Sequence, residues 1–101
     1  MTRNDTVARL AAVRGELSRI TPAGSRVHDA AFTDAGDYCF TIDRDGAPVL
    51  EVMVAADDIA SLAASEVISR LTGSRVFMHL LQSVDRHGAV SFRLRNLQPK
   101  P

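Results

Sequence analysis

The chain has 101 residues, of which 46% are apolar and 24% are charged, and its 12 basic and 12 acidic residues cancel to no net charge. This composition is that of an ordinary globular domain and excludes a disordered or fibrous chain, while the length fits one domain with one modest core. No stretch approaches the roughly 20 apolar residues that a membrane span requires.

Cys39 is the single cysteine. An intramolecular disulfide is therefore excluded, and nothing indicates an oxidising compartment. The first ten residues carry an acid, Asp5, and no continuous apolar run, so they do not have the pattern of a signal peptide. We therefore expect the protein in the cytoplasm.

The first part of the chain predicts an amphipathic helix over residues 5–20, because its apolar residues recur at three-, four- and seven-residue steps along one stripe. Asp5 or Thr6 can cap its N-terminus. Residues 26–33 then predict a weakly patterned strand.

The strongest signal is a hairpin within residues 37–54. Strand 38–43 places Tyr38, Phe40 and Ile42 on one face and Cys39 and Thr41 on the other. Strand 48–54 resumes the alternation after a turn. Asp43 and Asp45 in that turn share part of the pattern of a calcium loop. The glutamate that such a loop needs six positions after its glycine is absent, since position 52 is valine. We therefore predict a turn and no metal site.

A second helix is predicted over residues 57–71, with Asp57 and Asp58 at its start. Residues 75–83 predict a strand that is apolar on both faces, and residues 89–97 predict the last strand, which returns after a turn at 85–88. Residues 98–101 are expected to be a frayed tail.

The predicted fold is therefore a single α+β domain over residues 1–101, in the order α-β-β-β-α-β-β. Its sheet is five-stranded and mostly antiparallel, with two helices packed on one face. This order of elements is similar to that of class I type III secretion chaperones, small cytosolic dimers that wrap the secretion segment of an effector. The resemblance implies a dimer that binds protein.

A strand with two apolar faces must be covered on both sides. If both helices lie on one face of the sheet, a second chain is one candidate for the other cover, and the alternative is that the first helix or the loops wrap it. The first reading predicts an interface formed by Met53, Phe77, His79 and Leu81.

Cys39 and His28 are the candidate ligand-binding or reactive residues. With His79 they support an alternative function, a small-molecule-binding domain or small enzyme with a cavity between sheet and helices. Cys39 lies in mid-strand without a sequence neighbour that would lower its pKa. The histidines show no metal-ligand spacing and the chain has no phosphate-binding glycine loop, so no metal and no cofactor are predicted.

A basic patch of Arg86, Arg93 and Arg95 suggests nucleic-acid binding as a second alternative. Strand alternation, however, places Phe92 on the opposite face from Arg93 and Arg95, where it cannot serve as a stacking platform beside them. The leading prediction is a cytosolic protein-binding module (adaptor, chaperone-like or inhibitory) that forms a homodimer and binds an unknown client, without a membrane or nucleic-acid partner.

Overall fold

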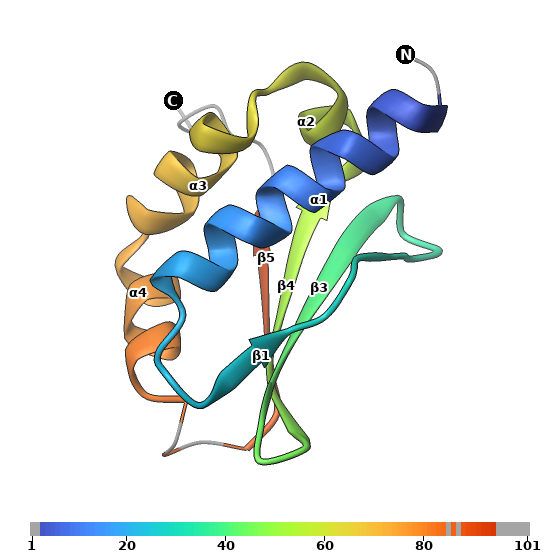
Figure 1. Ribbon diagram of the computed structural model, residues 1–101. Coiled ribbons are helices and arrows are strands. Elements are labelled where there is room, and N and C mark those ends of the chain that lie inside the picture. Colours follow the sequence, from blue (N-terminus) through green and yellow to red (C-terminus); the bar gives the residue numbers. More distant parts are fainter. Residues whose placement is uncertain (1–2, 85, 87, 95–101) are drawn as a thin grey trace.

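The computed structural model describes residues 3–84, 86 and 88–94. These residues form four helices and a five-stranded sheet, which confirms the α+β class (Figure 1). In chain order the elements are α1 (Arg3–Ile20), β1 (Ser25–Val27), β2 (Ala31–Phe32), β3 (Asp37–Arg44), β4 (Ala47–Ala55), α2 (Ala56–Ser61), α3 (Ala64–Thr72), α4 (Arg75–Gln82) and β5 (Val90–Leu94).

The hairpin of β3 and β4 is the centre of the sheet, as its alternation predicts. The strand order is β1-β3-β4-β5, and β2 also pairs with β3. Asp45 and Gly46 join the two strands, and both have positive φ, 54° and 81°. A two-residue turn of this kind matches the right-handed twist of a hairpin and favours glycine. The Asp-Gly pair is therefore used for the turn, as predicted.

The predicted strand over residues 26–33 is interrupted. Its two parts, β1 and β2, pair antiparallel with successive halves of β3, at Val27 opposite Ile42 and at Phe32 opposite Tyr38. Between them the chain leaves the sheet, and there Asp29 forms an ion pair with Arg14 of α1 at 3.1 Å.

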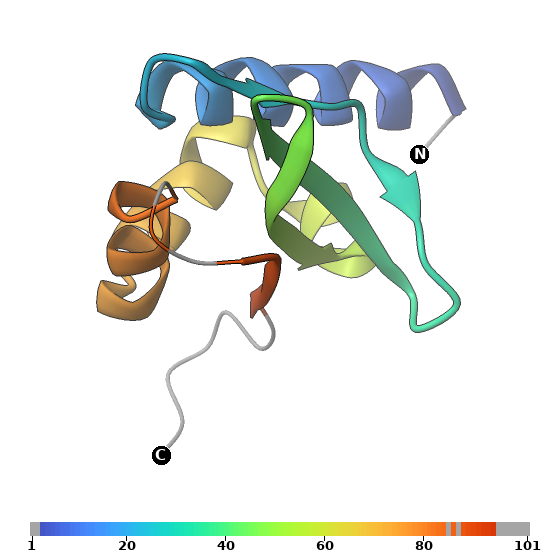
Figure 2. The same cartoon turned by 90° about the horizontal axis from the view of Figure 1, so that it is seen from below.

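All four helices pack on the same face of the sheet, and Figures 1 and 2 together show the strands on one side of this helical layer. The core fills the space between the two layers. From the sheet, the fully buried side chains are Phe40, Ile42, Leu50, Val52 and Val54. From the helices, they include Leu17, Ile59, Val67, Leu71 and Phe77. The face predicted for Phe40 and Ile42 is thus the core face.

The helix predicted over residues 57–71 is two helices, α2 and α3, because Leu62 and Ala63 are extended. The guanidinium of Arg9 explains how the chain tolerates this break. It donates hydrogen bonds to the carbonyl oxygens of Leu62 at 2.9 Å and Ile59 at 3.4 Å. Carbonyls at a helix end have no partner within the helix, so a donor from α1 replaces one.

The strand predicted over residues 75–83 is wrong, because these residues form α4. Ser74 caps the helix by accepting a hydrogen bond from the backbone N–H of Phe77 at 3.2 Å. Phe77, Leu81 and Val84 are buried, and their spacing of four and three residues is that of a helix face. A short apolar run fits either period, and the tertiary burial decides between them.

The last strand, β5, is confirmed over residues 90–94, and the rest of the predicted range, 95–97, lies outside the described residues. Its predicted pairing with residues 75–83 is wrong. β5 instead runs parallel to β4, with Val52 opposite Phe92, after the connection through α2, α3 and α4. The observed order therefore differs from the one that resembled type III secretion chaperones.

Phe77→Ala should lower the free energy of unfolding by about 3–5 kcal/mol, because the ring is fully buried and lies 5.3 Å from the ring of Phe92. Urea denaturation measures this loss. Val76→Ala is the control, since its side chain is 63% exposed and its loss should stay within about 0.5 kcal/mol. Equal losses at both positions would contradict the helical placement.

Candidate functional site

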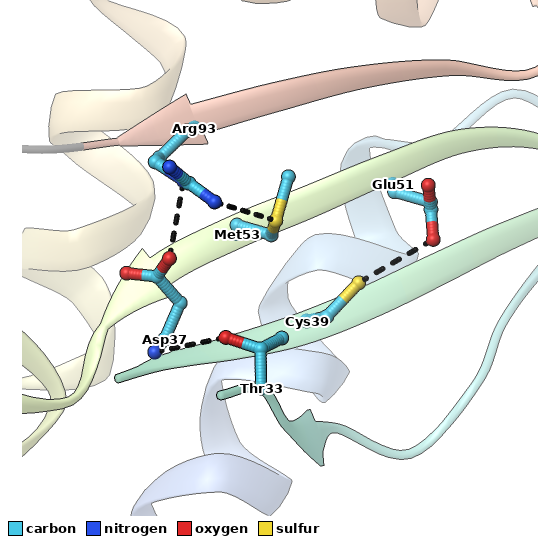
Figure 3. A network of polar contacts seen from close by, with 6 residues as sticks. All are labelled: Thr33, Asp37, Cys39, Glu51, Met53 and Arg93. Carbon is cyan, nitrogen blue, oxygen red and sulfur yellow. Dashed lines mark hydrogen bonds and ion pairs between the residues drawn. The ribbon is translucent and has the colours of Figure 1, made fainter. Parts of the chain in front are cut away.

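The face of the sheet that points away from the helices carries most of the polar groups of the central strands. We call it the outer face. Alternation along each strand defines its members, since their neighbours point into the core. They are Asp37, Cys39, Thr41 and Asp43 of β3, Glu51 and Met53 of β4, and Ser91 and Arg93 of β5. Figure 3 shows five of them close together above the strands.

Asp37 and Arg93 form an ion pair across the sheet, with Nε of Arg93 3.1 Å from Oδ2 of Asp37. The Asp37 side chain is only 2% exposed. The same guanidinium contacts the sulfur of Met53 at 3.7 Å (Figure 3). The Arg93 side chain is itself 37% exposed, and its guanidinium compensates the buried Asp37 carboxylate.

Glu51 lies in the middle of the outer face, opposite Thr41 on one side and Ser91 on the other. The Ser91 hydroxyl donates to its Oε1 at 3.1 Å, and the Cys39 thiol lies 3.9 Å from its Oε2. Both contacts come from neutral groups. Among the described residues, no arginine, lysine or histidine forms an ion pair with Glu51.

Cys39 is a half-buried free thiol. Burial raises its pKa above the ordinary value, and the Glu51 carboxylate raises the pKa further, against a smaller opposite effect of a hydrogen bond from Thr41. The neutral thiol is therefore favoured over the thiolate, which is the nucleophilic form. This electrostatic environment is the reverse of that around a catalytic cysteine.

His28 does not act with Cys39. Its Nε2 lies 2.6 Å from Oδ2 of Asp43, and its backbone N–H donates to the carbonyl of Thr41. The imidazole thus ties the end of β1 to β3. His79 is exposed on α4, in the helical layer and on the opposite side of the sheet from Cys39. The structure therefore separates the residues of the predicted small-molecule site.

The four predicted interface residues do not share a surface. Phe77 and Leu81 are buried in the core under the sheet, so their predicted exposure to a partner is wrong. The reason is that α4 turns the supposed second apolar face inward. Met53 is half-buried on the outer face, away from the exposed His79.

The predicted basic patch is also divided. Arg86 is exposed after the end of α4, and Arg93 is engaged with Asp37. Arg95 lies outside the described residues. Arg86 and Arg93 thus have different roles, since Arg86 is a surface charge and Arg93 forms an ion pair within the fold.

Two surface hollows border α1. One, of about 680 Å³, lies between α1 and the α2–α3 segment and is lined largely by alanines with Asp5 and Arg9. The other, of about 290 Å³, lies between α1 and the β1–β2 segment and ends at the Arg14–Asp29 pair. Neither is lined by Cys39, His28 or His79.

The described part of the chain contains no group of three or more histidine, cysteine or acidic side chains placed to hold a metal ion. None of the helices it forms has the length and apolar character that crossing a membrane requires. Comparison with protein-family models, with curated proteins and with solved structures finds no match for this chain.

Sequence reasoning missed Glu51 and Asp37 as members of the site. The signal for Glu51 was present, because alternation in residues 48–54 already places Glu51 and Met53 opposite the core residues Leu50 and Val52. No local signal identifies Asp37, because its partner Arg93 reaches it only through the parallel pairing of β4 with β5.

Arg93→Ala should lower the free energy of unfolding by about 1–3 kcal/mol, because it removes the cation that compensates the buried Asp37 carboxylate. Arg86→Ala is the matched control, since this arginine is exposed and its loss should stay within about 0.5 kcal/mol. Thermal or urea denaturation of both variants measures the difference. If both arginines were equally dispensable, the ion pair would have no structural role.

Native Cys39 should react with iodoacetamide more slowly at neutral pH than the same thiol in the urea-unfolded chain. The raised pKa lowers the thiolate fraction at any given pH, so the pH profile of labelling should be displaced toward higher pH. Glu51→Gln should move that profile part of the way back, because the effect of burial remains. The comparison uses the midpoint of each pH profile, because reduced access to the half-buried thiol lowers the rate at every pH without moving the midpoint. Labelling faster than in the unfolded chain would contradict this picture.

Proposed function

We propose that this chain is a protein-binding module, of the adaptor, chaperone-like or inhibitory kind, and that it binds through the outer face of its sheet. The observation that carries the proposal is the one-sided arrangement of the fold. All four described helices cover one face, and the other presents Thr41, Glu51 and Met53, which are only partly buried.

The chemistry of the outer face supports binding over catalysis. The Cys39 thiol is biased to its neutral form by burial and by Glu51, which raise its pKa. His28 is engaged with Asp43. A catalytic nucleophile needs a base within hydrogen-bond reach, and His28, the nearest sequence candidate, is bonded elsewhere.

The occupant of the outer face is another protein chain in this proposal, either a client or a second copy of this chain. An open face of three to four strands with a mixture of methyl, thioether, hydroxyl and carboxylate groups matches the mixed character of non-obligate protein interfaces. The single cysteine, kept as a thiol, fits a reducing compartment, and we propose the cytoplasm as the location.

Peptides selected on the full chain from a displayed library should bind the outer face. Thr41→Tyr adds a bulky, uncharged and strand-compatible side chain to this face and should weaken the selected peptides about tenfold or more, since burial of a hot-spot contact contributes at least about 1.4 kcal/mol. Ser69→Tyr on the exposed side of α3 is the control and should leave affinity unchanged. Binding that persists in Thr41→Tyr and is lost in Ser69→Tyr would assign recognition to the helical layer and reject the proposal.

Light scattering over a concentration series, run on the same three proteins, tests whether the partner is a second copy. A wild-type dimer that Thr41→Tyr converts to a monomer would identify self-association through the outer face. A monomer at all concentrations would leave a different chain as the occupant.

A further inference from the structure

We infer, resting on the function proposed above, that the partner of the outer face is a peptide segment that places a cationic side chain, arginine or lysine, on Glu51. Two carboxylates of the outer face have an arginine or histidine partner, and Glu51 has none among the described residues.

The three carboxylates of the outer face have different surroundings. Asp37 is paired with Arg93 at 3.1 Å, and Asp43 with His28 at 2.6 Å. Within the described part of the chain, Glu51 accepts a hydrogen bond from a hydroxyl and, weakly, one from a thiol. Glu51 is thus the carboxylate of this face that has neither an arginine nor a histidine partner among the described residues.

Neither Arg93 of the outer face nor Arg26 of the neighbouring strand β1 is placed to supply that cation. Arg93 is directed toward Asp37 and Met53 (Figure 3). Arg26 lies on β1 opposite Asp43, and the whole of β3 separates it from β4. A cation for Glu51 must therefore come from outside the described part of this chain.

The carboxylate of Glu51 has unused acceptor capacity. An ionised carboxylate offers about four lone-pair positions on its two oxygens. Ser91 uses one on Oε1, and the thiol of Cys39 makes one long contact to Oε2. One position on each oxygen is left, which is the pattern that a guanidinium fills with two parallel N–H···O bonds.

The neighbours of Glu51 suit the stem of such a side chain. Thr41 and Ser91 stand beside it in the same cross-strand row, and Cys39, Met53 and Arg93 form the next row. The Thr41 methyl, the thiol and the thioether provide a weakly polar floor for aliphatic carbons, which long cationic side chains lay along apolar surface. A metal ion fits less well, because it needs several carboxylate or imidazole ligands and Glu51 is the single one in this row.

The test is a selection from one displayed library of linear 12-residue peptides on four full-length proteins: wild type, Glu51→Gln, Glu51→Lys and, as control, Glu66→Gln on α3. Peptides from wild type and from Glu66→Gln should be enriched in arginine and lysine over the starting library. The enrichment should disappear on Glu51→Gln, and Glu51→Lys should favour aspartate and glutamate instead. Thr41→Lys places an ammonium directly opposite Glu51 and should also remove the enrichment. This variant replaces the Glu51 variants in the test if they do not fold.

The affinity of a single selected peptide then measures how much the contact between its cation and Glu51 contributes to binding. Its affinity should fall about tenfold or more on Glu51→Gln, as expected for loss of a charged hydrogen-bonded contact. Replacing its arginine by citrulline, which is neutral and nearly the same shape, should cause the same loss on wild type and none on Glu51→Gln.

The outcomes separate this inference from the proposed function. Peptides that bind the outer face without arginine or lysine enrichment, or that keep their cation preference on Glu51→Gln, would overturn the role of Glu51 and leave the binding module standing. Peptides that bind only the helical layer, or no selected peptides at all, would overturn the proposed function, and the role of Glu51 would fall with it.

Discussion

The structure depends on the alternation of the β3–β4 hairpin over its paired residues 37–42 and 50–55. Phe40, Ile42, Leu50, Val52 and Val54 all point to one side of the sheet and are fully buried. Because the side-chain period of a strand is two, every residue between them must point to the other side. The helices follow from this constraint, since the apolar side chains of α1, α2, α3 and α4 can all be buried only against that one face.

Alternation also explains why the hairpin could be predicted from sequence and the segment after it could not. The hairpin is specified by local signals, an apolar–polar period and an Asp-Gly turn. Residues 75–83 contain too few polar residues to distinguish a strand from a helix. Their actual state depends on burial of Phe77, Leu81 and Val84 under the sheet and on the Ser74 cap. Of these two causes, only the capping serine can be read from the local sequence. One serine is weak evidence for the start of a helix.

The candidate site was predictable to the extent that it lies within one hairpin. The sequence predicted Cys39 and Thr41 on the face opposite Phe40, and the structure confirms this. Contacts between β3 and β5 depend instead on the parallel pairing of β5 with β4. That pairing requires a connection of three helices, which no local pattern reveals. Arg93 was accordingly expected in a basic patch, and it is found beside Asp37.

The outer face combines charged pairs that stabilise the fold with Glu51, whose carboxylate has no such structural role. Burying Asp37 is costly unless a cation accompanies it, so the Arg93 ion pair serves the fold, and His28 on Asp43 ties β1 to the sheet. Glu51 is only partly buried and solvent can stabilise its charge, so folding does not require a cation there. A partner cation can therefore pair with Glu51 without breaking an ion pair among the described residues. By contrast, a partner that engaged Asp37 or Asp43 would first have to displace Arg93 or His28. Of the three carboxylates, Glu51 is thus the one that a partner cation can contact without displacing a side chain of this face.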